Sequence, residues 1–505
     1  MENGAQRTRA ALNLVRRVKC DEGLPACLRC TSTGRTCDGY AHIKTPTALI
    51  SVPAGLSLGI QACHRSKRAF AFFVQRTCSQ VAGFFGSDFW ERLVLQAAHH
   101  EPAVLHAIVA IGSRHELATQ QTAGVDAVET FALRQHNLAI RNLIDPSSSR
   151  QRGLDVYLML SILFACFENI RGNHALAITH IQSGVKLLQE TVYDQNTGQL
   201  HCQQFGSKSR VDSYATLESY AKIFALLDSR ASRMIGDYQR PFLEASSVVA
   251  NQIYGDSPIS FSSIDDAKAT FEYGACLFSG TLDAKLSDDS VQLPHSPVQD
   301  QRSHLANLMS KFWLAVQELV QSKGGSFTPK EELAAAVLQL NVLVTWISFE
   351  VELHPATTWD DFVPQLEEMV LLGERIVTSI SSGNDSRETT SFCLESGYVI
   401  PMYAVASNCQ DLKIRRRAIA VLRSVHRQEG LWNSLLTAKA AEMIIEIEER
   451  ESRGVNTCMG KLETLDLFRT RPLLKIDARG GRLHYTLNTQ EGDASNEMVE
   501  EVFSW

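Results

Sequence analysis

The sequence lacks the short motifs that mark the common enzyme families. It contains no G-x-S-x-G, no H-E-x-x-H and no G-x-G-x-x-G segment. The segment GVNTCMGKL, residues 454–462, approaches a phosphate-binding loop. It has one residue too many between its glycines, and Leu462 stands where Ser or Thr would bind magnesium. These absences predict that the chain is not an enzyme.

A secretory signal and a long apolar run are also missing. The first residues are polar and charged, and the longest apolar run, VYLMLSILFACF over 156–167, is too short to cross a bilayer and predicts a buried helix. We therefore expect no membrane partner and a reducing compartment, in which the twelve cysteines form no disulfides. Ordinary core thiols explain eight of these cysteines, which are scattered along the chain: Cys63, Cys78, Cys166, Cys202, Cys276, Cys393, Cys409 and Cys458.

The chain as a whole has no excess of positive charge, but its first part does. The net charge is -7 over 505 residues, whereas residues 1–45 contain eight Lys or Arg against four acids. A small basic segment ahead of an acidic body indicates local contact with a polyanion and excludes a protein that coats nucleic acid over its whole surface.

Strand patterns are scarce, and helical periodicity dominates the chain after about Phe70. We predict a mainly α fold, with a large multi-helix domain over 66–487 and a short hairpin that turns at Gly480–Gly481. No repeat of fixed period is present. In the amphipathic segment DLKIRRRAIAVLRSVHRQ we expect Arg415, Arg416 and Arg417 to lie mostly away from the apolar stripe. The main helical segments are predicted near 87–100, 101–118, 127–145, 153–172, 174–192, 210–236, 264–286, 301–322, 329–353 and 360–381.

Two further segments lack a helical period. Residues 41–65 contain prolines and glycines and no heptad repeat, which predicts a linker without a coiled-coil seam. Residues 488–505 carry five acids interleaved with apolar residues and no Lys or Arg. This acidic tail is either a disordered activation segment or a terminus whose Trp505 docks on the body.

Four cysteines near the basic segment need an explanation of their own. Cys20, Cys27, Cys30 and Cys37 have the spacing C-x6-C-x2-C-x6-C in a short polar stretch with no core to bury thiols. Thiolates at such spacing bind zinc tetrahedrally, and the metal then supplies the folding energy that the missing core cannot. The pattern predicts a structural zinc module over residues 1–40.

The stretch RRVKCDEGLPACLRCTSTGRTCDGY resembles the fungal Zn2Cys6 transcription factors, and the helical body resembles their regulatory domain. The family pattern has six cysteines that hold two zinc ions. Its third to sixth cysteines match Cys20, Cys27, Cys30 and Cys37, while the first two positions are occupied by Ala10 and Asn13. Four thiolates can complete one tetrahedral zinc site but not two, so one zinc ion or none is expected in this chain.

The resemblance implies a nuclear regulator of RNA polymerase II genes that binds double-stranded DNA. Lys19 would read a CGG-like triplet, and Arg17 and Arg16 would contact phosphates. A second copy of the chain and transcription co-regulators are further expected partners. Two accounts of the missing cysteine pair stay open: a misplaced start or splice boundary, or a genuine loss that weakens DNA binding. The alternative function is a helical regulatory or interaction protein without specific DNA binding.

Overall fold

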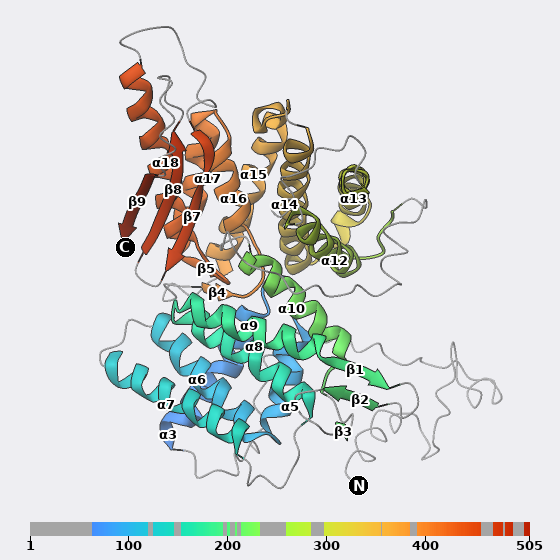
Figure 1. The fold of residues 1–505 in the computed structure, drawn as a ribbon, viewed down its shortest axis with the longest axis vertical. Coiled ribbons are helices and arrows are strands. Elements are labelled where there is room, and N and C mark those ends of the chain that lie inside the picture. The colour runs from blue at the N-terminus through green and yellow to red at the C-terminus, as the bar shows by residue number, and fades with distance from the viewer. Residues whose placement is uncertain are drawn as a thin grey trace, which may run out of the picture. The chain divides into compact units, whose positions relative to one another are not determined.

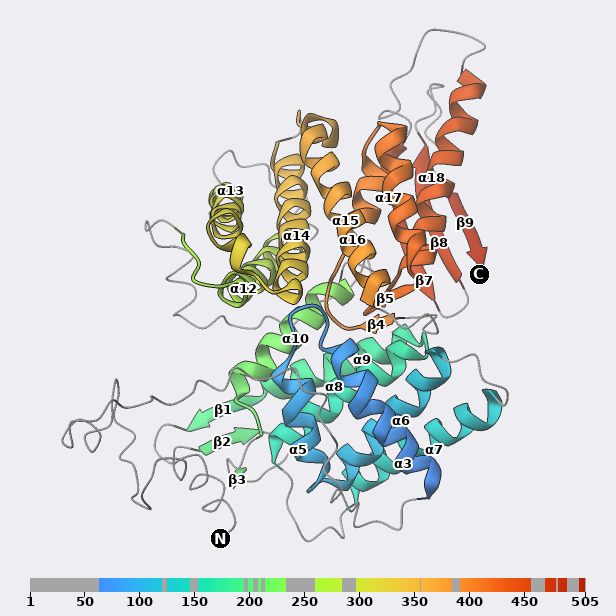
Figure 2. The same ribbon diagram turned by 180° about the vertical axis from the view of Figure 1, so that it is seen from behind.

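Helices make up most of the part of the chain that the structure, a computed structural model, describes (Figures 1 and 2). The described residues are 63–119, 125–145, 153–194, 199–202, 208–209, 214–232, 259–283, 297–354, 356–383, 391–455, 468–477, 480–487 and 499–504. The chain divides into two units, Met1–Ile60 and Gln61–Trp505. The described helices and strands all lie in the second unit.

The first group of helices packs around α6 and α8. In this group α6 contacts α3, α7 and α8, while α9 lies between α8 and α10. Figure 1 shows these helices side by side, in blue to green. The group consists of α3 (His64–Phe72), the π-helix η1 (Phe73–Thr77), α4 (Cys78–Val81), the π-helix η2 (Phe89–Leu93), α5 (Val94–Ala98), α6 (Pro102–Thr119), α7 (Val125–Ile144), α8 (Leu154–Ile170), α9 (His174–Gln189) and α10 (Leu217–Ser232).

The second group of helices follows in sequence from Ile264. Here α14 contacts α12, α13, α15 and α16, and α17 packs against α15, α16 and α18. The group consists of α12 (Ile264–Asp283), α13 (Pro297–Lys323), the 3-10 helix η3 (Gly324–Ser326), α14 (Pro329–Leu353), the 3-10 helix η4 (Trp359–Phe362), α15 (Val363–Gly383), α16 (Val399–Asn408), α17 (Leu412–Ser424) and α18 (Ser434–Val455).

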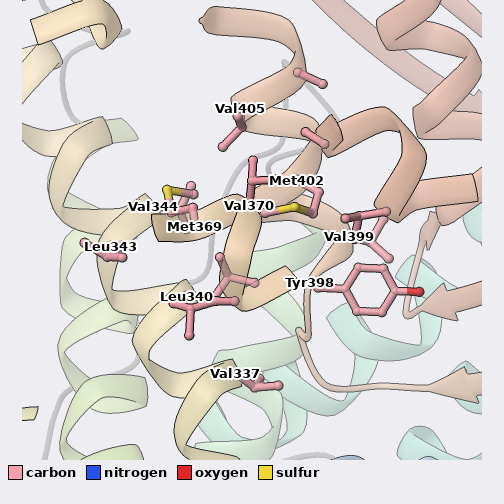
Figure 3. Packing of buried hydrophobic residues seen from close by; sticks show 14 of the residues in the cluster. Val337, Leu340, Leu343, Val344, Met369, Val370, Tyr398, Val399, Met402 and Val405 are labelled. Atoms are coloured by element: carbon pink, nitrogen blue, oxygen red, sulfur yellow. The ribbon is translucent and has the colours of Figure 1, made fainter. Parts of the chain in front are cut away.

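The main hydrophobic core lies in this second group. Figure 3 shows Val337, Leu340 and Val344 of α14 beside Met369 and Val370 of α15, with Met402 and Val405 of α16 in the same cluster. Within the described part, α14 is also the one helix whose length and apolar composition would suit a membrane span. Because 72% of the most apolar 18-residue stretch of α14 is buried inside the protein, α14 serves as a core helix.

Local sequence fixes the starts of several helices. Thr328 caps α14 through a capping box, in which its side chain accepts from the Glu331 amide and the Glu331 carboxylate accepts from the Thr328 amide. Pro329 follows at the first helical position, where its missing N–H costs no hydrogen bond. Asp411 caps α17 by accepting from the amides of Lys413 and Ile414.

Three small sheets accompany the helices. β1 (Thr191–Asp194), β2 (Gln199–Cys202) and β3 (Lys208–Ser209) form an antiparallel sheet. β4 (Ser391–Cys393) pairs parallel with β5 (Arg427–Glu429), which pairs antiparallel with β6 (Trp432–Asn433). β7 (Phe468–Asp477), β8 (Gly480–Leu487) and β9 (Val499–Ser504) form the third sheet, in that order.

The prediction of a mainly α protein with a C-terminal β-hairpin is confirmed. The hairpin does not turn at Gly480–Gly481, however. Asp477 pairs with Gly480 and Ile476 with Gly481, so both glycines belong to β8. Within the predicted acidic tail, Val499–Ser504 form the strand β9, which pairs with β8.

Candidate functional site

The predicted zinc and DNA-binding residues all lie outside the described residues. They are Cys20, Cys27, Cys30, Cys37, Lys19, Arg17 and Arg16. The division of the chain at Ile60 and Gln61 places them in a unit separate from the helical body. What the structure tests is whether the body offers a further site for chemistry, metal or nucleic acid.

The densest polar cluster in the body surrounds Arg427 and Glu429 on β5. The Arg427 Nε lies 2.9 Å from Glu429 Oε1, and the two side chains are 7% and 0% exposed. Arg427 also donates to Ser391 Oγ at 2.7 Å and to Cys393 Sγ at 2.9 Å. Its guanidinium lies 4.4 Å from the centre of the Phe84 ring. The buried Arg427 guanidinium thus donates its hydrogen bonds to neighbouring side chains.

Glu429 holds the start of α16. Its Oε2 accepts hydrogen bonds from the amides of Gly397 at 2.8 Å and Val399 at 3.1 Å, and its Oε1 accepts from the Tyr398 amide at 3.2 Å. A carboxylate at this position satisfies amides that have no partner inside the helix, and it is stabilised by the helix dipole. Gly397 is required for this approach, since a Cβ there would lie 2.2 Å from Glu429 Oε1.

Burial and charge act in opposite directions on Arg427. Burial alone would lower the pKa of Arg427, but Cys393 and Glu429 raise it well above its usual value. The guanidinium therefore stays charged at any pH at which the protein is folded. Burial also raises the pKa of the nearby Tyr398, so its hydroxyl stays neutral.

The same small sheet contacts the first group of helices. The Gln428 side-chain amide donates to the Asn169 carbonyl at 2.9 Å, and the Phe392 amide donates to Gln80 Oε1 at 3.3 Å. Lys268 of α12 lies 2.8 Å from Glu395 Oε1, just after β4. Segments that are up to about three hundred residues apart in sequence therefore meet at β4, β5 and β6.

This junction offers no evident chemistry. Its charged groups are paired with one another, and no group of three or more His, Cys, Asp or Glu side chains in the described part of the chain could hold a metal ion. The prediction that the chain is not an enzyme is confirmed by the families that its sequence matches. The junction therefore has a structural role, because it joins distant segments of the chain. The sequence did not predict it, since β4, β5 and β6 are too short to show an alternating pattern.

Three of the four arginines of α17 are paired with acids on neighbouring elements, whereas Arg416 is exposed. Arg415, expected to lie away from the apolar stripe, is buried; its Nη1 contacts Glu448 and its Nε donates to the Ala406 carbonyl. Arg417 pairs with Glu374 of α15 at 2.9 Å, and Arg423 pairs with Glu442 of α18. These pairs join α17 to its neighbours, so most of its arginine charge is already balanced by carboxylates.

The histidines that gather near α5 and α6 have ordinary structural roles. The buried His115 shares hydrogen bonds with Thr77 Oγ1 at 2.9 Å and Gln80 Oε1 at 3.1 Å. His106 Nδ1 forms a hydrogen bond with Gln135 Oε1, while His99 and His100 are exposed. Burial lowers the pKa of His115 to about 4, which keeps the ring neutral at pH 7.

The scattered cysteines behave largely as predicted. Cys78, Cys166, Cys393 and Cys409 are buried and form no disulfide, and burial raises the pKa of Cys78 to about 12 and that of Cys409 to about 11. Cys63 is the exception, because it is exposed. The side chains of Cys202, Cys276 and Cys458 lie outside the description.

Two protein families match the sequence. Residues 15–46 match the fungal Zn(2)-Cys(6) binuclear cluster domain, and residues 68–311 match the fungal specific transcription factor domain. The first match contains the four clustered cysteines and begins after Ala10 and Asn13. No solved structure matches the chain.

Three curated proteins are similar to parts of the chain. The aspercryptin biosynthesis cluster-specific transcription regulator atnN of Emericella nidulans is 29% identical over 211 residues, which is 35% of this chain and 33% of that protein. The transcription regulator lscL of Purpureocillium lilacinum is 29% identical over 198 residues, 35% of this chain and 47% of that protein. An uncharacterized transcriptional regulatory protein of Schizosaccharomyces pombe is 28% identical over 158 residues, 26% of this chain and 27% of that protein. The chain spans less than half the length of each of these relatives.

Proposed function

Because this chain belongs to the fungal transcription regulators with a Zn(2)-Cys(6) cluster domain, we propose that it binds specific DNA sequences and regulates genes transcribed by RNA polymerase II. The observation that carries the proposal is the match over residues 15–46, which combines the four cysteines with Arg16, Arg17 and Lys19. The names of the three relatives, all of them transcription regulators, support the proposal. Such a protein acts in the nucleus.

Lys19 is the proposed base-reading residue. A lysine in the major groove can donate to the O6 and N7 atoms of guanine, which suits a CGG-like triplet. Arg16 and Arg17 precede it by two or three positions and are proposed to contact phosphates, which set the register on DNA without reading bases. In the described body, Arg415, Arg417 and Arg423 of α17 are paired with acids, which makes this helix a weaker candidate for DNA contact than the basic first segment.

The donor set of the first segment fits one zinc ion. The thiolates of Cys20, Cys27, Cys30 and Cys37 would fill one tetrahedral coordination shell, whereas a binuclear cluster needs two further cysteines at the positions of Ala10 and Asn13. When bound, the metal supplies the folding energy of a segment that has no hydrophobic core. We expect one zinc per chain, which native mass spectrometry can count.

Fluorescence anisotropy with a CGG-containing duplex and a scrambled duplex tests the proposal. Lys19→Ala should weaken binding to the CGG duplex by about 1 to 3 kcal/mol and bring both duplexes to similar affinity. Arg16→Ala and Arg17→Ala should weaken both duplexes equally and reduce the slope of log K against log salt by about one each. Equal affinity of the unaltered protein for the two duplexes would contradict the proposal.

The alternative is a regulator that acts through protein contacts alone. Ala10 and Asn13 favour it, because the cysteine pair that normally adjoins the DNA-reading segment is missing. Zero bound zinc together with a salt slope near zero would select this alternative. Co-regulators would then be its partners through the helical body.

A further inference from the structure

The sheet β7–β8–β9 has two edges of different character. β7 contains Pro472, and its pairing with β8 is shifted between Phe468 and Thr470 and again between Thr470 and Leu473. Proline and bulges are the usual means by which proteins prevent strand addition at an edge. β9 has neither, since Val499–Ser504 pair with Tyr485–Gly480 without a shift.

Charge does not protect the edge of β9 either. Acidic residues at an edge normally repel an incoming strand, and β9 has two. Each is paired within the same chain: Glu500 lies 3.1 Å from Arg482 Nη1 of β8, and Glu501 lies 3.1 Å from Arg450 Nη2 of α18. The carboxylates are thus partly neutralised before a partner arrives.

The exposed face of the sheet presents an apolar side chain at the middle of β9. Val502 is 69% exposed and lies opposite the exposed Arg482, while the next pair, Leu483 and Glu501, has Leu483 fully buried. Among the described residues no strand pairs with the outer edge of β9. An unbulged, partly neutralised edge with an exposed valine is suited to strand addition.

We propose that a second copy of this chain occupies this edge, with the two β9 strands antiparallel about a two-fold axis. If the two-fold axis is normal to the sheet, the exposed faces of the two copies form one continuous face. Two residues that lie opposite each other across the axis must therefore point to the same face of the sheet. A register centred on Glu500 or Glu501 would set two like charges directly opposite each other, which is destabilising. Centred on Val502, each valine meets its own copy, and Glu500 and Glu501 lie opposite the uncharged Ser504 and Phe503.

The contact is small. Five paired residues span about 17 Å, and the interface is below the roughly 1,600 Å² of a standard stable complex. The dimer is therefore concentration-dependent, with the two basic first segments available to two neighbouring DNA sites. This route to a dimer needs no coiled coil, in keeping with the linker's lack of a heptad repeat.

Cysteine cross-linking of the full-length chain tests the register without DNA, so its outcome is independent of the proposed DNA binding. Directly opposite residues in an antiparallel pair have Cβ atoms about 4.5 to 5.5 Å apart, within reach of a disulfide after small adjustment. Under a mild oxidant, V502C should give a dimer linked between the two substituted positions, identified by peptide mass spectrometry. E500C on the same face is the control, because the register separates its two copies by four residues. Equal cross-linking of V502C and E500C would overturn the proposal.

Sedimentation velocity, which measures the monomer–dimer equilibrium in solution, provides a second test of the interface. The unaltered chain should show a monomer–dimer equilibrium that shifts with concentration. Val502→Lys sets two ammonium groups opposite each other and should raise the dimer Kd by at least about tenfold. Val502→Thr, which stays β-branched and uncharged, should leave the Kd within about threefold. Circular dichroism confirms that each variant is folded. A monomer at all concentrations, or a dimer unaffected by Val502→Lys, would refute the interface.

Discussion

At the scale of single residues, the Arg427–Glu429 pair makes a prediction about stability. Glu429→Gln would leave the buried Arg427 guanidinium without its counter-charge and remove one carboxylate oxygen from the start of α16. Breaking a buried pair in this way costs about 3 to 5 kcal/mol. Urea unfolding followed by circular dichroism should show this loss of unfolding free energy.

The surface pair Arg423–Glu442 provides the matched control. Its side chains are 49% and 35% exposed, so solvent screens the attraction. Glu442→Gln should therefore cost no more than about 1 kcal/mol. The junction would lose its assigned role if Glu429→Gln cost as little as Glu442→Gln.

Because burial lowers the pKa of several histidines, we predict that the body loses stability in acid. Burial lowers the pKa of His115 and of His136 to about 4, below the value near 6.5 of an unfolded chain. The unfolded state therefore binds protons first, and stability is lost as pH falls from about 6.5 to about 4. Each of these two histidines accounts for about 3 kcal/mol of this loss. Unfolding free energies measured between pH 7.5 and 4.5 test the slope.

His136 can be separated from other acid-sensitive groups by substitution. Its ring stacks on Phe167 with centroids 4.5 Å apart, and its Nε2 is buried without a hydrogen-bond partner among the described residues. His136→Phe keeps an aromatic ring there that cannot bind a proton, so the variant should lose the part of the slope that His136 contributes. His115, His180 and His426, whose pKa values burial also lowers, should keep their parts. The exposed His99, changed to Gln, should leave the profile unaltered. An unchanged slope in His136→Phe would show that His136 is not the titrating group.

Residue patterns in the sequence predict which residues are apolar core better than which polar residues are buried. The run over 156–167 is buried in α8 as its composition predicts, apart from Tyr157 and Ser161, which are partly exposed. The burial of Arg415 was not predicted, because its partners, Glu448 and the Ala406 carbonyl, belong to α18 and α16. The helical period places an arginine on a face of its own helix but carries no information about a carboxylate on another element.

At the scale of elements, the crossing of α3 and α6 depends on Gly112. A Cβ at Gly112 would lie 2.2 Å from the Ala69 carbonyl oxygen and 3.0 Å from Phe73 Cβ. Because the first obstacle is backbone, the helices must separate to admit a methyl group. Gly112→Ala should cost about 1 to 3 kcal/mol by overpacking, despite alanine's better helix propensity.

Gly325 is the control for this prediction. A Cβ at Gly325, in the 3-10 turn between α13 and α14, would meet nothing within 4 Å. Gly325→Ala should therefore leave the melting temperature within about two degrees, whereas Gly112→Ala should lower it by several degrees. Similar melting temperatures for the two variants would show that α3 and α6 do not approach as closely as described.

Elements with a long period were predictable, and elements with few residues were not. The helix expected over 329–353 is α14 with the same bounds, since a capping box and Pro329 mark its start. β4 and β5 have three residues each, too few for an alternating pattern to be distinguished from a loop. The glycine pair of β8 was mistaken for the turn because Gly-Gly is a common turn signal, while the register pairs Gly480 with Asp477 and Gly481 with Ile476.

At the scale of the whole molecule, the division at Ile60 and Gln61 separates two sources of stability. The body from Gln61 is held by a hydrophobic cluster centred on α14, α15 and α16 and by the buried β5 ion pair. The first segment contains Cys20, Cys27, Cys30 and Cys37, which are proposed to bind a structural zinc ion. The proposed function therefore requires that metal controls DNA binding without controlling the fold of the body.

Chelation tests this separation directly. Removing zinc with a strong chelator should abolish preference for the CGG duplex, because the thiolates of Cys20, Cys27, Cys30 and Cys37 then lose the ion that folds their segment. The far-UV circular dichroism and the main thermal transition should stay largely unchanged, since all the described helices lie in the other unit. Adding back zinc, but not magnesium, should restore binding, because thiolates favour zinc and magnesium favours oxygen ligands. If the chelator melted the body together with DNA binding, zinc would be part of the helical core, and the first segment could not be the independent DNA-reading module.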